Sequence, residues 1–348
     1  MQISKNPNTK KAENTGSQPF SFDLPQRLRR NRKSPAIRSL LQEYHLLPSQ
    51  LIAPLFVVEG DNQMQPIHSM PEVYRFSIDL LVKEVLELYQ LGIRAVNLFT
   101  YVPQNKKDPL GTEALRSGNL LQKALYALKK EIPEMCLMAD IALDPFTDHG
   151  HDGILNDKSE IDNDPTIEIL GKMSILAAEA GADVVSPSDM MDGRVAYIRG
   201  TLDKWGYQNV SILSYAAKYA SAFYGPFRDA LDSAPKFGDK KTYQMNPCNS
   251  REALLECLLD EEEGADMLLI KPALPYLDII AKVKQQSLLP VGAYHVSGEY
   301  SMVMAAAANG WINRDAVLTE SLLSIKRAGA DFILTYAARH MAKLLRKG

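Results

Sequence analysis

The stretch ELYQLGIRAVNLFTYV, residues 87–102, carries a pattern in which a helix-like amphipathic segment ends at a glycine and a short apolar run follows. The same pattern returns in AAEAGADVVSPS (177–188), DEEEGADMLLIKPA (260–273) and IKRAGADFILTYA (325–337). Each repeat places a glycine where the left-handed end of a helix favours one: Gly92, Gly181, Gly264 and Gly329. The apolar runs do not alternate with polar residues, which is typical of parallel strands covered on both faces.

Four further apolar runs lack this glycine but have the length and composition of buried strands: LIAPLFVV (51–58), MCLMADIAL (135–143), VSILSYAAK (210–218) and PVGAYHVS (290–297). Together the runs predict eight strands separated by helices, which is the alternation of a (β/α)8 TIM barrel. A doubly wound sheet is the main alternative, but it usually has a glycine-rich phosphate loop after its first strand, and APLFVVEGDNQ has none. We therefore predict a barrel domain over residues 36–348.

The composition narrows the class of protein. The 348 residues include 39 Lys and Arg against 42 Asp and Glu, and this net charge of −3 argues against a general nucleic-acid binder. No run approaches the roughly 18 consecutive apolar residues of a membrane span. The three cysteines, Cys136, Cys248 and Cys257, lie far apart, so they form neither a disulfide framework nor a thiolate-rich zinc site. These features predict a cytoplasmic protein with neither nucleic-acid nor membrane partners.

The charge is unevenly distributed. Residues 1–35 carry eight basic and two acidic side chains, a net +6, which leaves −9 for the rest of the chain. We predict that this segment is an extended N-terminal arm whose first 20 or so residues are disordered, because they are polar and poor in apolar residues. The basic cluster RLRRNR, residues 27–32, favours docking on an acidic surface of the same or a neighbouring subunit, with phosphate binding as the alternative. An organelle transit peptide is another interpretation of the arm.

Polar side chains stand at or just after the ends of the predicted strands, where barrel enzymes place their active sites. They are Tyr101, Asp140, Asp144, Ser188, Asp189, Lys218, Lys271, Tyr294, Ser297 and Tyr336. Lys218 and Lys271 close neighbouring predicted strands, which lie about 4.8 Å apart in a sheet. Burial and a second ammonium both favour a neutral amine, which can attack a ketone to form a Schiff base. Alternatively, each lysine pairs with a carboxylate such as Asp140 or Asp189.

Two segments near these strand ends carry further candidate groups. Residues 219–247 form a long irregular stretch that we interpret as a lid, in which Arg228 and Lys240 can hold a substrate carboxylate. DIALDPFTDHGHDG, residues 140–153, concentrates carboxylates without thiolates, which suits a hard cation such as Mg²⁺. The alternative is that these carboxylates are acid/base groups or partners of the lysines. The two histidines of the segment, His149 and His151, are by themselves more typical of hydrogen-bonded loop residues than of metal ligands.

Four motifs match a known family. SYAAKYASAFYGPFRDA (214–230), LIKPALPYLD (269–278), PSDMMDGR (187–194) and YHVSGEY (294–300) resemble those of the delta-aminolevulinic acid dehydratases, also called porphobilinogen synthases. The resemblance runs from about Arg27 to the end of the chain. It implies a (β/α)8 barrel that condenses two 5-aminolevulinate molecules to porphobilinogen, with loss of two waters, in tetrapyrrole biosynthesis.

The resemblance also assigns roles to residues of this chain. Lys271 would form the Schiff base with the substrate that becomes the propionate-bearing side, and Lys218 would form the one with the other substrate. The resemblance assigns Ser297 and Tyr336 to the first substrate carboxylate, and Arg228, Lys240 and Gln244 to the second. From their places at the strand ends and in the loop over 140–153, we further predict substrate contacts at Ser188, Asp189 and Tyr294 and catalytic carboxylates at Asp140, Asp144 and Asp152.

The metal expected from the resemblance is Mg²⁺. Zinc-dependent members carry three cysteines where this chain has Ala142, Asp144 and Asp152, so we expect no catalytic zinc. The chain resembles the aspartate-rich, magnesium-responsive subgroup, in which an allosteric Mg²⁺ is held by a glutamate at the position of Glu256. The residues themselves leave open whether Asp144 and Asp152 bind a metal or act as acid/base groups. The family also implies a homo-octamer, and some members form a smaller hexamer.

Two other functions fit parts of the sequence. A Schiff-base aldolase would use the same barrel, but it needs one lysine and usually has a phosphate site near strands seven and eight. A barrel kept only as an assembly module would be favoured if the strand-end lysines were lost, and both Lys218 and Lys271 are present.

Overall fold

The computed structural model describes residues 24–346, so the predicted disorder of the first 20 residues lies outside the described part. The chain divides into two compact units between Glu43 and Tyr44. Described on its own, the first unit contains a 3₁₀ turn, η1 (Leu28–Arg32), and helix α1 (Pro35–Leu40). Helix α1 begins at Ser34, whose hydroxyl accepts a hydrogen bond from the amide of Ile37.

The second unit is a closed barrel of eight parallel strands, which confirms the predicted (β/α)8 architecture. Each predicted apolar run contains one of them, and β10 pairs with β1 to close the barrel. In barrel order the strands are β1 (Leu51–Val57), β4 (Ala95–Thr100), β5 (Cys136–Ile141), β6 (Val184–Pro187), β7 (Ser211–Lys218), β8 (Met267–Lys271), β9 (Val291–His295) and β10 (Phe332–Thr335).

Burial on both faces explains why the strand sequences are continuously apolar. All of β1 is buried, and its residues divide alternately between two hydrophobic clusters. Ile52 and Phe56 belong to a smaller cluster inside the barrel, together with side chains from the other strands such as Phe99 and Leu213. Leu51 and its alternate neighbours belong to the larger cluster between the strands and the helices.

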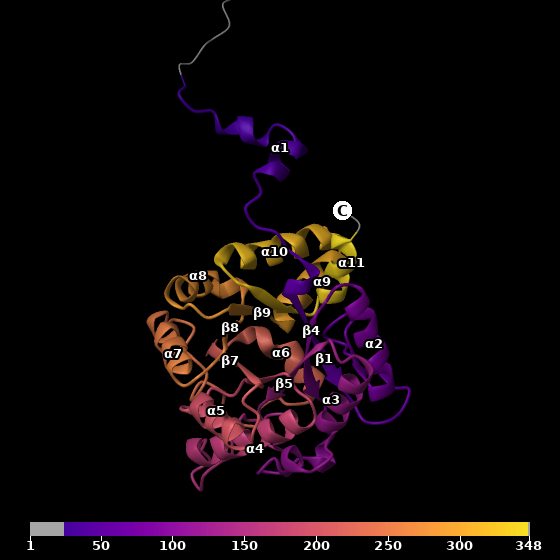
Figure 1. The fold of residues 1–348 in the computed structure, drawn as a ribbon, viewed down its shortest axis with the longest axis vertical. Helices are drawn as coiled ribbons and strands as arrows, with labels where there is room; N and C mark the ends of the chain where they lie inside the picture. The colour runs from indigo at the N-terminus through magenta and orange to yellow at the C-terminus, as the bar shows by residue number, and fades with distance from the viewer. Residues whose placement is uncertain (1–23, 347–348) are drawn as a thin grey trace, which may run out of the picture. The chain divides into compact units, whose positions relative to one another are not determined.

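Helices surround the strands, as Figure 1 shows for α2, α3, α4, α5, α7 and α8. Gly92, Gly181, Gly264 and Gly329 follow helices with φ angles of 94°, 96°, 100° and 120°, as the sequence pattern predicts. In chain order the helices of the second unit are α2 (Ile78–Gln90), α3 (Leu120–Glu131), α4 (Asn163–Glu179), α5 (Arg194–Lys204), α6 (Gly225–Leu231), α7 (Arg251–Glu262), α8 (Leu277–Gln286), α9 (Ser297–Ala308), α10 (Arg314–Ala328) and α11 (Ala338–Leu345).

Two segments differ from the simple barrel pattern. A hairpin of β2 (Met64–Pro66) and β3 (Tyr74–Phe76) follows β1, and β3 pairs with β1. The prediction of an irregular stretch over 219–247 is wrong in its first part, where η5 (Ala222–Tyr224) and helix α6 lie. Pro226 occupies the first turn of α6, a position that tolerates proline because its missing N–H needs no partner there. Within residues 24–346, no helix is both long and apolar enough to cross a membrane.

Candidate active site

The two strand-end lysines lie side by side. Lys218 is the last residue of β7 and Lys271 the last of β8, and the two are paired directly across the sheet. Each is only 5% exposed, so both amines lie inside the protein. A buried lysine is uncommon unless its amine is paired or used, because removing an ammonium from water is costly. The predicted adjacency of the two lysines is confirmed, but their surroundings differ.

The amine of Lys271 faces aromatic rings. Its Nζ atom lies 5.2 Å from the ring centre of Tyr215, 5.0 Å from those of Tyr224 and Phe227, and 4.9 Å from that of Tyr294. Burial, with repulsion from Lys218 as the next cause, lowers the pKa of Lys271 to about 7. The lysine is therefore available as a neutral amine near neutral pH.

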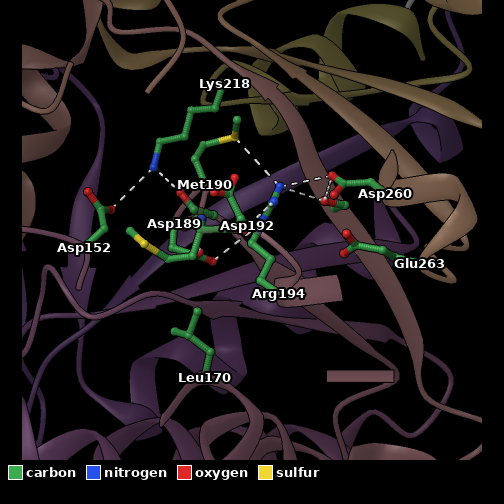
Figure 2. A network of polar contacts seen from close by, with 12 residues as sticks. Asp152, Leu170, Asp189, Met190, Asp192, Arg194, Lys218, Asp260 and Glu263 are labelled. Atoms are coloured by element: carbon green, nitrogen blue, oxygen red, sulfur yellow. Dashed lines mark hydrogen bonds and ion pairs between the residues drawn. The ribbon is translucent and has the colours of Figure 1, made fainter. Parts of the chain in front are cut away.

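The amine of Lys218 faces oxygen atoms instead. Its Nζ atom donates to the backbone carbonyl of Ser188 and lies 3.5 Å from Oδ1 of Asp152 (Figure 2). The sequence-based alternative for this lysine named Asp140 or Asp189 as the carboxylate, and the structure gives Asp152 that place. This correction follows from the loop after β5, which brings residue 152 back over the barrel end.

Lys240 from the lid occupies the position between two of the predicted catalytic carboxylates. Its Nζ atom lies 2.9 Å from Oδ2 of Asp152 and 3.5 Å from Oδ2 of Asp144. Burial opposes the charge of this lysine, but the two carboxylates outweigh it and raise the pKa of Lys240. Burial likewise opposes the charge of Asp152, while Lys218 and Lys240 hold its pKa well below the usual range. These carboxylates thus have ammonium partners in the structure.

The pKa of Asp140 shifts in the opposite direction to that of Asp152. Asp140 is the second-last residue of β5, and its Oδ1 atom is buried with no hydrogen-bond partner in the described part of the chain. Burial and repulsion from Asp144 raise the pKa of Asp140, although Lys271 opposes the shift. A carboxyl group that holds a proton near neutral pH can serve as a general acid.

The histidines of the same loop make hydrogen bonds within the protein. His149 Nε2 lies 3.3 Å from the carbonyl of Pro109, and His151 contacts the hydroxyl of Tyr243 at 3.1 Å and the carbonyl of Phe237 at 3.0 Å. Within residues 24–346, no group of three or more His, Cys, Asp or Glu side chains is arranged to hold one metal ion.

Asp189 lies in a buried network behind Lys218 (Figure 2). Its Oδ2 atom is 3.8 Å from Nε of Arg194, and burial raises its pKa to about 6 despite that guanidinium. Arg194 also donates to Oδ2 of Asp260 at 3.0 Å and to the hydroxyl of Ser214 at 3.2 Å. The structure therefore places Asp189 against an arginine of α5, while the neighbouring Ser188 carbonyl contacts Lys218.

The residues predicted to hold the first substrate carboxylate lie on the Lys271 side. The hydroxyls of Tyr294 and Tyr336 are 2.8 Å apart, and Tyr294 also contributes a ring beside Lys271. Ser297 begins α9, and its hydroxyl accepts a hydrogen bond from the amide of Phe227 at 3.0 Å. These side chains come from the ends of β9 and β10, so the barrel brings them together.

The residues predicted for the second carboxylate lie on the lid. Arg228 stands on helix α6 and is half-buried, and Gln244 is buried with its Oε1 atom lacking a hydrogen-bond partner among the described residues. Gln244 also lines a cavity of about 960 Å³, together with Asp192, Glu252 and Glu256. Glu256 lies on α7, and burial raises its pKa to about 6, although Arg194 opposes the shift. Its predicted metal site thus lies on a carboxylate-rich cavity wall.

Sequence reasoning missed the aromatic surroundings of Lys271 and the role of Arg194. The rings of Tyr215, Tyr224 and Phe227 come from β7, η5 and α6, so their convergence depends on the closed barrel. The one local signal is the aromatic content of AFYGPF, residues 222–227, shortly after a strand-end lysine. A single arginine at the start of a helix gives no comparable signal, because most arginines are exposed.

The fold and the buried polar groups at its strand ends define a (β/α)8-barrel enzyme. Residues 25–344 match the family described as Delta-aminolevulinic acid dehydratase. The chain is 52% identical to the delta-aminolevulinic acid dehydratase of Chlamydia pneumoniae, over 94% of this chain and 98% of that protein. It is also 52% identical to the chloroplastic delta-aminolevulinic acid dehydratase of Glycine max, over 93% of this chain and 79% of that protein.

A solved structure agrees with these relatives. The delta-aminolevulinic acid dehydratase of Toxoplasma gondii, in complex with the reaction product porphobilinogen, has a TM-score of 0.91 and 51% sequence identity, over 92% of each chain. The chain therefore belongs to the delta-aminolevulinic acid dehydratase family. Membership of this family decides against the aldolase alternative.

Proposed function

We propose that Lys271 and Lys218 each form a Schiff base with one of the two 5-aminolevulinate molecules that the chain condenses. As a member of its family, the chain converts two 5-aminolevulinate molecules to porphobilinogen, with loss of two waters, in tetrapyrrole biosynthesis. The observation that carries the Schiff-base proposal is the pairing of the two buried lysines across neighbouring strands. Two amines this close together can each hold one substrate as an imine while the two substrates are joined.

Lys271 is the amine that the surroundings prepare most strongly. A neutral amine attacks a ketone carbonyl, and loss of water gives the imine. Burial and the neighbouring Lys218 favour the neutral amine of Lys271, and the surrounding aromatic rings shield its imine from hydrolysis. Lys218 forms the imine with the other substrate, and its amine contacts the Ser188 carbonyl and lies 3.5 Å from Oδ1 of Asp152.

The carboxylates supply the remaining proton transfers. Asp140, held protonated by burial, donates a proton when a substrate oxygen leaves as water. We assign Asp144 and Asp152 as acid/base groups and not as metal ligands, because Lys240 already compensates their charge in the structure. A substrate carboxylate that binds under the lid can replace one of the two aspartates as a partner of the Lys240 ammonium. Arg228 and Gln244 would be the other contacts of that substrate carboxylate. Lid closure then excludes water from both imines.

On the Lys271 side, Ser297 and Tyr336 bind the carboxylate of the first substrate. These two hydroxyls come from the ends of β9 and β10. The hydroxyl of Tyr336 also lies 2.8 Å from that of Tyr294. Hydroxyl donors suit a carboxylate whose charge is already compensated by an ammonium on the same substrate. Ser188 and Asp189 complete the site around Lys218, with the Ser188 carbonyl directly on the amine.

A divalent cation fits the cavity wall at Glu256. Mg²⁺ prefers oxygen ligands and keeps several waters, so the Glu256 carboxylate would hold it with water completing the coordination in the space of the cavity. Bound there, Mg²⁺ would supply positive charge to helix α7 and the lid, outside the group of lysines. The loop at Ala142, Asp144 and Asp152 has no thiolate for a catalytic zinc.

For the assembly and location we propose a cytoplasmic homo-octamer, with a hexamer as the smaller form. The basic residues 27–32 at the N-terminal arm would dock on an acidic neighbouring subunit. Deleting residues 1–33 and measuring the mass in solution tests this part, since an unchanged octamer would contradict the role of the arm.

The two-lysine chemistry is tested by Lys271→Met and Lys218→Met. Both variants should reduce pyrrole formation from 5-aminolevulinate to background, because each removes an amine that no neighbour replaces. Borohydride added with substrate reduces an imine to a stable secondary amine, and peptide mapping then identifies the modified lysine. The parent enzyme should carry adducts on Lys271 and on Lys218, and the Lys271→Met variant should lose the adduct on Lys271. Full turnover by either variant would exclude the proposed chemistry.

A further inference from the structure

Glu299, in the first turn of α9, carries a buried carboxylate that the proposed reaction does not use. Its side chain is 1% exposed, and both of its oxygens accept backbone hydrogen bonds. One comes from the amide of Leu274, 2.5 Å away and three residues after Lys271. The other comes from the amide of Val296, directly before Ser297. The carboxylate therefore joins the segment after β8 to the segment after β9.

The two hydrogen bonds need a carboxylate in particular. The amides of Leu274 and Val296 are both donors, and they lie on different segments, so one side chain must offer two acceptors pointing in two directions. Burial raises the pKa of Glu299 to about 7, while the surrounding amides oppose the shift by binding the charged form. Burying a carboxylate costs free energy of folding, so its two hydrogen bonds must offset that cost.

The rest of the same turn contacts the segment after β7. The Ser297 hydroxyl accepts from the amide of Phe227 at 3.0 Å and donates to the carbonyl of Phe223 at 3.3 Å. A Cβ atom at Gly298 would lie 2.5 Å from that carbonyl, so only glycine allows this approach. Residues 297–299 thus hold two segments that lie next to Lys271. Glu299 holds the backbone after Lys271, and Ser297 holds the backbone of Phe227, whose ring centre lies 5.0 Å from the Lys271 amine.

We propose that Glu299 is a positioning residue for Lys271. It fixes the backbone after β8 against α9, so that the amine stays among its aromatic rings and meets the substrate carbonyl in one geometry. Lys218 is held by different contacts, on Asp152 and Ser188, and does not depend on Glu299. The inference rests on the proposed function, because it assigns the residue that holds one of the two Schiff-base amines.

Glu299→Gln tests the proposal with little change in shape. The amide keeps one acceptor but turns an NH₂ group toward the second backbone donor, so one of the two segments is released. Borohydride trapping of 5-aminolevulinate on the Lys271 peptide should fall at least about tenfold, while trapping on the Lys218 peptide stays within about twofold. The kcat should fall by a similar factor with little change in KM, since positioning of the amine, not substrate binding, is lost.

The matched control is Glu84→Gln, which changes a largely buried carboxylate on α2 that pairs with Arg339. This control should lower stability and leave trapping on both lysines at the parent level. A second variant, Glu299→Asp, keeps the charge but is too short to reach both amides, so it should give a smaller selective loss at Lys271.

Three results would overturn the proposal. The first is parent-level trapping on Lys271 in both Glu299 variants, and the second is an equal loss on both lysines, which a purely structural role predicts. The third is failure of both variants to fold, which would make Glu299 a folding residue. Failure of the proposed function is recognised separately, because the parent enzyme would then trap substrate on neither lysine.

Discussion

The surroundings of Lys271 and Lys218 differ, although the two residues are paired across neighbouring strands. Lys271 is buried among four aromatic rings, and this burial, with repulsion from Lys218 as the next cause, lowers its pKa to about 7. Lys218 faces oxygen atoms instead, those of the Ser188 carbonyl and the Asp152 carboxylate. The comparison shows that the side chains from adjoining segments, and not the position at a strand end, prepare one amine for attack before the other.

The polar surroundings of Lys218 depend most on Asp152. Asp152→Asn removes the carboxylate that both Lys218 and Lys240 face, so two buried lysines lose their nearest carboxylate. We expect kcat to fall about 100-fold, the scale of a lost acid/base group. The assay is pyrrole formation from 5-aminolevulinate. Asp157→Asn, at an exposed position of the same loop, is the control, and equal rates for the two variants would remove Asp152 from the mechanism.

The aromatic surroundings of Lys271 are tested by the pH dependence of kcat/KM. Below pH 7 the Lys271 amine becomes protonated and cannot attack, so kcat/KM should fall as the pH decreases through about 7. Phe227→Ala admits water to the amine and weakens the burial that lowers its pKa. The acid limb should therefore move to higher pH in this variant. Phe237→Ala, an exposed phenylalanine of the lid, should leave the limb in place, and identical shifts would contradict the account.

The smallest effect is expected away from both lysines, at Glu256. Activity after chelation should be restored by Mg²⁺ but not by Zn²⁺, and Glu256→Gln should lose this few-fold response while keeping its basal rate. The control is Glu262→Gln, an exposed glutamate of the same helix, which should respond as the parent does. Restoration by Zn²⁺ alone would contradict the assignment of the metal.

The fold could be predicted because its signals are local. A helix end, a glycine and an apolar run occur within about a dozen residues, and the structure confirms a strand in each run, from β1 to β10. The strand-end position of Lys218 and Lys271 follows directly from these runs. Helix α6 was missed because Gly225 and Pro226 were interpreted as loop residues, whereas a helix accepts both in its first turn.

The detailed site could be predicted only in part, because it depends on contacts between distant segments. Lys240 was expected to hold a substrate carboxylate, and in the structure it pairs with Asp144 and Asp152, more than 80 residues earlier. Glu299 was part of a recognised motif, but its partners Leu274 and Val296 become visible only when α9 packs against the end of β8. Residue types indicate the chemistry, while partners and protonation depend on packing.

The protonation of Lys271 in the substrate-free enzyme tests the central claim most directly. Trace labelling of the full-length enzyme with acetic anhydride modifies only neutral amines, and peptide mapping at a series of pH values gives the titration of that lysine. The account predicts half-maximal labelling of Lys271 near pH 7. Half-maximal labelling near 10.5, the ordinary value for lysine, would show that the aromatic rings do not prepare this amine and would contradict the account.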